Sequence, residues 1–170
     1  MLKPTVQRTG RTWRLTMSQW LNKPPAELFE FFGNATNLEK ITPKMLGFKV
    51  LTPTPIEMKP GTLIDYKLKV RGVPIRWRTL IATWDPPHKF TDEQLKGPYQ
   101  RWHHTHTFTE ENGGTRCDDL VDYRPPGGPL APLINKLAVQ RDVEKIFAYR
   151  AKVLEEMFGS TPSPNGRGVG

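Results

Sequence analysis

The segment Phe90–Phe108, FTDEQLKGPYQRWHHTHTF, restricts the fold of this chain more than any other stretch. A Gly-Pro pair divides it into two runs that alternate as β-strands do. Alternate side chains of a strand point to opposite faces of its sheet. One face of the second run therefore carries Trp102, His104, His106 and Phe108. The two aromatic side chains predict that this face is buried, so two imidazoles stand where most proteins have valine or isoleucine.

The first run of this segment has the same mixed character, because Phe90, Asp92 and Gln94 share one face. A strand face that is both apolar and polar usually lines a cavity rather than a solid core. The five Trp, eight Phe and four Tyr residues of the chain can supply aromatic walls for such a cavity. The sequence therefore predicts an internal cavity that accepts an apolar or amphipathic molecule.

Strand and helix patterns follow one another in an order that indicates an α+β fold. Strand patterns occupy residues 12–21, 47–52, 62–70, 74–84, 88–96, 99–110 and 115–123. Helical patterns occupy residues 25–33, 35–41 and 130–158. Short Gly-, Pro- and Asn-containing connections favour an antiparallel meander. We predict a curved antiparallel sheet of about six to seven strands around a long C-terminal helix, with two short helices after the first strand.

The last helical pattern has one apolar face, which we expect to pack against the sheet. The residues that recur on it at helical spacing are Leu133, Leu137, Val143, Phe147, Leu154 and Phe158. Together these patterns predict one domain over residues 12–158, a size that can bury a substantial core. Residues 1–11 are polar and are predicted to be flexible, and residues 159–170, GSTPSPNGRGVG, have the composition of a disordered tail.

Charge and cysteine content narrow the possible partners and the compartment. The chain has 25 Lys+Arg against 17 Asp+Glu, a formal net charge of +8, which favours anionic partners but also simply aids solubility. Cys117 is the only cysteine, so no internal disulfide can form, as is usual in a reducing compartment. Neither a membrane-spanning apolar run nor the apolar region of a secretory signal is evident. We therefore predict a cytoplasmic protein.

Several short motifs, together with the order of elements, resemble one known superfamily. They are Asn37-Leu38 with Ile41-Thr42-Pro43, Gly61 with Ile64-Asp65-Tyr66, Trp77, Trp84-Asp85-Pro86-Pro87, Phe90-x-Asp92-x-Gln94, Gly97-Pro98-Tyr99-x-x-Trp102-x-His104-x-His106-x-Phe108, Asp119-x-Val121-x-Tyr123-x-Pro125 and Phe147-x-Tyr149-Arg150. Over about residues 12–158 the chain resembles the SRPBCC superfamily of START domains, birch-pollen-allergen-like proteins, polyketide cyclases and coenzyme-Q-binding proteins, and in particular its bacterial ligand-binding branch. The resemblance implies a helix-grip fold.

Strand alternation directs a set of polar and aromatic side chains toward the interior, where they would bind the ligand. These candidates are Tyr66, Trp77, Asp92, Gln94, Trp102, His104, His106, Asp119 and Tyr123, joined by Phe147 and Arg150 from the last helix. The main prediction is a protein that binds, transports or sequesters a small hydrophobic or amphipathic molecule, and binding is favoured over catalysis. Its polar groups would fix one end of an apolar ligand.

Two other interpretations of the same residues stay open. The first is a polyketide cyclase or dehydratase in which His104 or His106, held by Asp92 or Asp119, transfers protons. The second is a metal site, because His104-x-His106 places two imidazoles on one strand face and either aspartate could complete the ligand set. Spacing alone is a weak signal for metal, so the favoured prediction includes no metal and no other cofactor.

The outer face of the central strands carries a possible second contact surface. Lys67, Lys69, Arg76 and Arg78 share the outward direction on neighbouring strands. This basic patch is either an ordinary solvated face or a surface for transient contact with an anionic membrane. Nucleic acid is a less favoured partner, because no exposed aromatic side chain is expected beside these charges. His103 points away from its histidine neighbours and is expected to meet solvent.

Overall fold

In the computed structural model, which describes residues 3–159, all strands belong to one antiparallel sheet in the order β1-β2-β8-β7-β6-β5-β4-β3. The strands are β1 (Thr5–Thr9), β2 (Thr12–Leu21), β3 (Lys49–Val50), β4 (Leu63–Val70), β5 (Val73–Asp85), β6 (Lys89–Lys96), β7 (Arg101–Glu111) and β8 (Gly114–Arg124). Neighbours from β3 to β8 in the sheet are also neighbours in the chain, and β2 pairs with β8 at the end of this meander. The predicted antiparallel sheet is confirmed.

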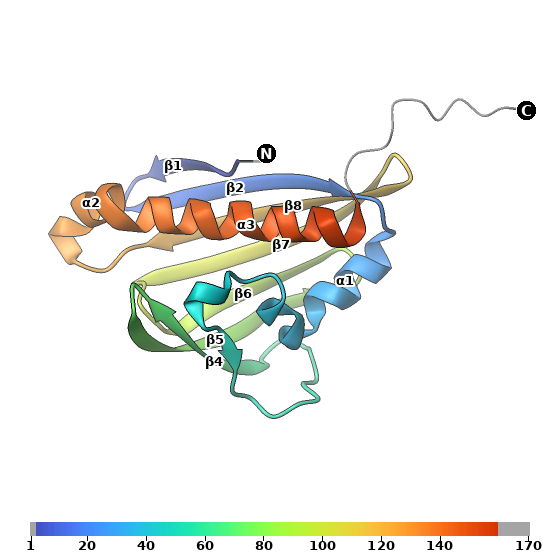
Figure 1. Ribbon diagram of the computed structural model, residues 1–170, viewed down its shortest axis with the longest axis horizontal. Helices are drawn as coiled ribbons and strands as arrows, with labels where there is room; N and C mark the ends of the chain where they lie inside the picture. The colour runs from blue at the N-terminus through green and yellow to red at the C-terminus, as the bar shows by residue number, and fades with distance from the viewer. Residues whose placement is uncertain (1–2, 160–170) are drawn as a thin grey trace, which may run out of the picture.

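Helix α3 (Gln140–Phe158) lies across one face of this sheet (Figure 1). Helix α1 (Pro25–Gly33) packs on the same face, since Phe29 contacts Phe108 and the α3 residue Phe147 contacts His104 on that face of β7. The remaining helical segments are η1 (Ala35–Glu39), η2 (Lys44–Leu46), η3 (Gly128–Leu130), α2 (Ala131–Ile134) and the π-helical turn η4 (Asn135–Val139). A sheet that holds a long C-terminal helix, with short helices after β2, is the predicted helix-grip arrangement.

Three apolar clusters are buried among the described residues, and two of them lie under the helices α3 and α1. One lies beneath α3 and includes Leu15, Val121 and Phe147. The other surrounds α1 and includes Phe29 and Phe108. Because both helices pack on β7 and β8, the strand segment between the two clusters is shielded from solvent on both sides. The candidate site occupies this segment.

The N-terminal segment differs from the prediction. Residues 1–11 are expected to be flexible, yet Thr5–Thr9 form strand β1, which pairs with β2 through a turn at Gly10. The strand was missed because Val6 is its only apolar residue that packs against the core, and an edge strand can be held by backbone hydrogen bonds without alternating hydrophobicity. The sheet therefore has eight strands rather than six to seven. Residues 160–170 of the predicted disordered tail lie outside the described residues.

The C-terminal helical region also differs in one respect. Val143, Phe147 and Leu154 are buried as predicted, whereas Leu133 and Leu137 are 54% and 70% exposed. Leu133 lies in α2, before the π-helical turn η4, and Leu137 lies within this turn, whereas the buried residues lie in α3. A π turn adds a residue to the helical repeat and so rotates the segment before it relative to the segment after it. The apolar spacing was correct within each segment but not across the turn.

None of the helices among residues 3–159 is long and apolar enough to cross a membrane.

Candidate functional site

Strands β6, β7 and β8 place four ionisable side chains side by side. Asp92 on β6 is the cross-strand partner of His104 on β7, and Asp119 on β8 is the partner of His106. Cross-strand partners on one face have Cβ atoms about 4.5–5.5 Å apart. The register of the sheet thus brings together the four residues that we call the His–Asp cluster.

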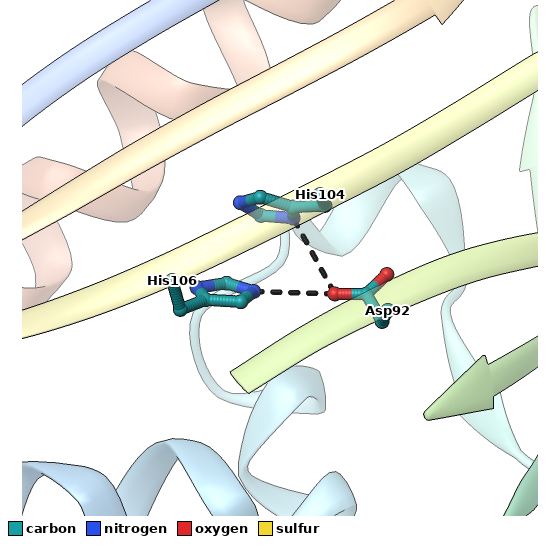
Figure 2. A group of neighbouring side chains, drawn as sticks. All are labelled: Asp92, His104 and His106. Carbon is teal, nitrogen blue, oxygen red and sulfur yellow. Dashed lines mark hydrogen bonds and ion pairs between the residues drawn. The ribbon is translucent and has the colours of Figure 1, made fainter. Parts of the chain in front are cut away.

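Each imidazole of the His–Asp cluster lies between the two carboxylates. His104 Nε2 is 2.8 Å from Asp119 Oδ1, and its Nδ1 is 3.7 Å from Asp92 Oδ2. His106 Nδ1 is 3.0 Å from Asp119 Oδ1, and its Nε2 is 3.2 Å from Asp92 Oδ2. Figure 2 shows both rings directed at the same carboxylate oxygen of Asp92. The cluster is therefore a closed ring of alternating imidazoles and carboxylates.

Aromatic side chains hold the two imidazoles in place. The rings of His104 and His106 have centroids 3.7 Å apart. The ring of Phe90 stacks on His106 at 4.2 Å, and the ring of Phe147 meets His104 edge-on at 5.4 Å. Phe32 of α1 lies 5.9 Å from His106. Side chains from both apolar clusters thus restrict the rotation of the imidazoles.

Burial differs within the cluster. The side chains of His104 and His106 are 5% and 7% exposed, whereas those of Asp92 and Asp119 are 18% and 15% exposed. The carboxylates therefore retain more access than the imidazoles that they contact. A ligand approaching the cluster would reach the carboxylates more readily than the imidazole rings.

Burial and charge act in opposite directions on the pKa values of the cluster. Burial disfavours ionisation of Asp92 and Asp119, but the hydrogen bonds and charges of the two histidines outweigh it and lower the pKa of both carboxyls. Burial and the neighbouring imidazole together lower the pKa of His104, whereas contacts with both carboxylates overcome burial and raise the pKa of His106. The expected state has two carboxylates and at most one imidazolium.

Arg150 of α3 is a cationic side chain whose charge acts on the cluster, since it helps to lower the pKa of Asp92. Its guanidinium carbon lies 5.1 Å from the centroid of the Phe147 ring. Its Nε is buried and has no hydrogen-bond partner among the described residues. Burial lowers the pKa of Arg150, while the charges of Asp119 and Asp92 oppose this shift. A buried guanidinium nitrogen that lacks a hydrogen-bond partner is unusual, because desolvation of a charged group is costly unless it is paired.

Half-buried aromatic rings extend the site along the sheet. Trp77 and Trp102 meet edge-on at 5.4 Å, and Tyr99 contacts both rings, at 5.7 Å and 4.8 Å. Tyr123 is fully buried beside Trp102, and its hydroxyl has no hydrogen-bond partner among residues 3–159. Burial raises the pKa of Tyr123 to about 12. We call Trp77, Tyr99, Trp102 and Tyr123 the aromatic cluster; that it lines a ligand site stays a prediction.

Two candidate residues have roles that the sequence did not show. The amide of Gln94 donates to the carbonyl of Tyr99 at 2.7 Å and so braces the turn between β6 and β7. The side chain of Gln94 fills the space where a side chain at Gly97 would lie.

Tyr66 is buried, and burial together with the charge of Asp92 raises the pKa of its hydroxyl. Tyr99 was missed, and its place after the Gly-Pro turn was the available signal.

The pockets found among the described residues lie away from the predicted cavity, so they do not test it. One pocket of about 380 Å³ lies between β1 and α2 and is lined by Arg8, Arg11 and Arg124. Another, of about 520 Å³, lies where the start of α1 meets β6 and β7. Neither is lined by a residue of the His–Asp cluster. A cavity between the sheet and α3 stays a prediction.

The predicted basic patch on the outer face is only partly available. Lys67, Lys69 and Arg76 are exposed, and Lys67 and Arg76 are cross-strand partners on β4 and β5. Arg78 instead makes two hydrogen bonds to Asp65, at 2.8 Å and 2.9 Å. His103 was expected to meet solvent but is 29% exposed and lies 2.8 Å from Glu93. The patch is weaker than the count of basic residues suggests.

Known proteins that resemble this chain have the same fold as the one described above. The family model described as polyketide cyclase / dehydrase and lipid transport matches residues 21–148. A protein from Thermus thermophilus has 19% identity and a TM-score of 0.68 over 84% of this chain and 94% of its own. A protein from Mycobacterium smegmatis has 19% identity and a TM-score of 0.65, with 92% and 99% of the two chains covered.

A third solved structure carries a named activity. The Zhui aromatase/cyclase from a Streptomyces species has 12% identity and a TM-score of 0.61 over 86% of this chain and 96% of its own. At such identities the likeness shows a common fold alone. No curated protein matches the chain at a significant level.

Proposed function

Because the chain belongs to the polyketide cyclase / dehydrase and lipid transport family, we propose that it binds a small amphipathic molecule between its sheet and helix α3. The apolar part of the ligand would lie against the aromatic cluster, and its polar end would face the His–Asp cluster. Ligand sites of this kind combine mostly apolar walls with a few polar groups that fix orientation. The described side chains offer both elements on one face of the sheet.

The buried Nε of Arg150, a residue that is otherwise half-buried, is the observation that carries this proposal. Its Nε has no hydrogen-bond partner among residues 3–159, although hydrogen bonds to charged groups are worth about 1.5–3 kcal/mol. An acidic group of the ligand would supply the missing partner. We therefore expect a ligand with a carboxylate, sulfonate or comparable anionic end.

Two dyes that differ in charge can test this proposal. Anilinonaphthalene sulfonate is anionic, and phenylnaphthylamine has a similar aromatic body without the charge. We expect both to bind at one per chain with increased fluorescence. Trp102→Ala should weaken both dyes, because it removes part of the apolar wall. Arg150→Met should weaken only the sulfonate, by about 10- to 100-fold.

Arg101→Met is the matched control for the dye experiment, because Arg101 is an exposed arginine on β7. It should leave both dyes unaffected. Failure of both dyes to bind would contradict the site. Equal weakening of the two dyes by Arg150→Met would contradict an anionic end to the ligand, because the loss would then come from packing.

A second candidate function is a cyclase or dehydratase that uses the same cluster for proton transfer. It is supported by the contact of each imidazole with a carboxylate, at 2.8 Å for His104 and 3.2 Å for His106. A carboxylate in such contact orients an imidazole for proton transfer. A compound extracted from protein purified from its own host provides the test. It should stay unchanged after incubation if the protein only binds, whereas an enzyme would convert it and lose about 10²–10⁴ of its rate in His106→Asn.

A further inference from the structure

The two carboxylates of the His–Asp cluster do not play equal parts. A single oxygen of Asp119 lies 2.8 Å from His104 Nε2 and 3.0 Å from His106 Nδ1. An ionised carboxylate only accepts hydrogen bonds, so His104 Nε2, which is hydrogen-bonded to Asp119, carries the hydrogen. A neutral imidazole has one N–H, and its other nitrogen then carries a lone pair. Asp119 therefore directs the lone pair of His104 away from itself, and it does the same for His106 when the hydrogen of that ring is on Nδ1.

Both of these lone pairs point toward Asp92. His104 Nδ1 and His106 Nε2 lie 3.7 Å and 3.2 Å from the same oxygen of Asp92, as Figure 2 shows. The three ligand atoms all lie within 4.8 Å of one another. Three electron-pair donors that face each other in a buried site repel one another unless a positive charge lies between them.

A proton on His106 is one possible source of that charge, but it joins only one of the two imidazoles to Asp92. A proton on His106 Nε2 can be donated to Asp92 across 3.2 Å. His104 Nδ1 at 3.7 Å is too far for a hydrogen bond to the same oxygen. A cation between the three donors would contact both imidazoles and the carboxylate.

We infer that Asp92, His104 and His106 bind a divalent transition-metal ion, with Asp119 positioning both imidazoles. Two donors at about 2.0–2.2 Å from a tetrahedral ion lie about 3.3 Å apart. The 3.2 Å separation of His106 and Asp92 matches this value, and the 3.7 Å separation of His104 and Asp92 needs to shorten by about 0.4 Å. Imidazole nitrogens favour ions such as Zn²⁺ or Fe²⁺ over Mg²⁺ or Ca²⁺.

Asp119 fits the part of a positioning residue. Metal-binding histidines usually donate their second ring N–H to a carboxylate, which fixes the orientation of the ring and raises its basicity. Here one carboxylate lies within 3.0 Å of the second nitrogen of both histidines. Three protein ligands also leave at least one coordination position open, as in catalytic rather than structural zinc sites.

This inference deepens the proposed function, on which its biological role rests, because the ion would lie at the polar end of the same site. A divalent ion would balance the charges of Asp92 and Asp119. The charge of Arg150, which no ion pair in residues 3–159 neutralises, would then attract an anionic ligand to the open position. Metal and Arg150 would act on the same end of the ligand.

The test uses the tag-free full chain, stripped with a chelator and titrated with Zn²⁺ alone in a calorimeter. We expect one Zn²⁺ per chain and no binding of Mg²⁺. His104→Asn should weaken Zn²⁺ binding by 100-fold or more, and Asp119→Asn by about 10- to 100-fold. The matched control is His103→Asn, because His103 is adjacent in sequence but contacts Glu93 on the other face. It should leave Zn²⁺ affinity unchanged.

Two further measurements keep the test decisive. Co²⁺ bound to the same site should give visible absorption bands that disappear in His106→Asn, and circular dichroism should show that each variant remains folded. Absence of stoichiometric Zn²⁺ binding, or equal losses in His103→Asn and His104→Asn, would overturn the inference. Binding of the two dyes to metal-free protein is measured separately. Dye binding without Zn²⁺ binding therefore contradicts the metal site alone, and Zn²⁺ binding without dye binding contradicts the ligand site alone.

Discussion

The two faces of strand β7 hold histidines in very different surroundings. On the outer face, His103 Nδ1 lies 2.8 Å from Glu93 Oε1, with the two side chains 29% and 40% exposed. On the inner face, His104 Nε2 lies at the same 2.8 Å from Asp119 Oδ1, with side-chain exposures of 5% and 15%. The two contacts have the same distance and nearly the same chemistry. They differ in their access to water.

The difference in access to water decides how much each contact contributes to the stability of the fold. An exposed ion pair exchanges hydration for a contact of similar strength, and its net value is about 0–1 kcal/mol. A buried charge that loses its partner keeps the full cost of desolvation, so breaking a buried pair costs about 3–5 kcal/mol. The two contacts therefore contribute different free energies although their distances are equal. Variants on the two faces of β7 can measure the difference.

The largest expected effect follows from removing one carboxylate on each face. Asp119→Ala leaves two buried imidazoles without their shared acceptor, and we expect it to lower the free energy of unfolding by about 3–5 kcal/mol. Glu93→Ala removes the acceptor of His103 on the outer face and should lower it by less than about 1 kcal/mol. Urea unfolding of both variants provides the measurement. Equal losses would show that the inner cluster is hydrated in solution.

A smaller effect of opposite sign is expected when the whole inner cluster is replaced. Asp92, His104, His106 and Asp119 can be exchanged together for apolar residues of similar volume. Such replacements of buried ionic groups are often neutral or stabilise a protein by about 1–4 kcal/mol. We expect the replaced protein to unfold at higher urea concentration than the original. This result would indicate that the cluster is retained for binding or chemistry rather than for stability.

The contradicting result for that replacement is a large loss of stability with intact secondary structure by circular dichroism. It would mean that the hydrogen bonds of the cluster outweigh the desolvation of its charges. The matched outer-face control is the double replacement of Glu93 and His103 by polar uncharged residues, which should change stability little because both side chains are partly exposed.

The contrast between the faces and the four members of the His–Asp cluster were predicted from the sequence, but the contacts between them were not. Alternation along residues 101–111 correctly separated His103 from His104 and His106, because a strand fixes the direction of its side chains. Pairing between strands depends on register, and β5 and β6 contain irregularities near Thr79 and Ile81 that no sequence pattern reveals. Which carboxylate meets which ring nitrogen also depends on side-chain torsions that packing decides.

The helical region shows the same limit. Spacing of apolar residues predicted the buried face of α3 around Phe147. It failed at Leu133, which precedes the π turn, and at Leu137, which lies in it, because this turn shifts the helical phase relative to α3. The turn sequence, NKLAV, contains no Gly or Pro that would announce an irregular helix. Arg150 was predicted near the cavity from the same spacing, but only the packed structure shows its unpartnered Nε.

The smallest expected effect concerns the outer face again, where Asp122 is the cross-strand partner of His103. Asp122 accepts two hydrogen bonds from Arg14, at 2.8 Å each, and this guanidinium lowers the pKa of the carboxyl. A lowered pKa means that the contribution to stability is complete above the ordinary aspartate value of about 3.9 and is lost as the pH falls below it. Because the Arg14 side chain is 45% exposed, we expect a contribution of less than about 1 kcal/mol.

Comparison of Asp122→Asn with the original protein at several pH values measures this contribution. The difference in unfolding free energy should be constant between about pH 5 and pH 7 and should shrink toward zero as the pH approaches 3. It should also shrink at 1 M salt, where the screening length is about 3 Å. A difference that stays constant at low pH would show that Asp122 acts through packing rather than charge. A difference of several kcal/mol would remove the contrast between the faces, because an exposed pair would then contribute as much as a buried one.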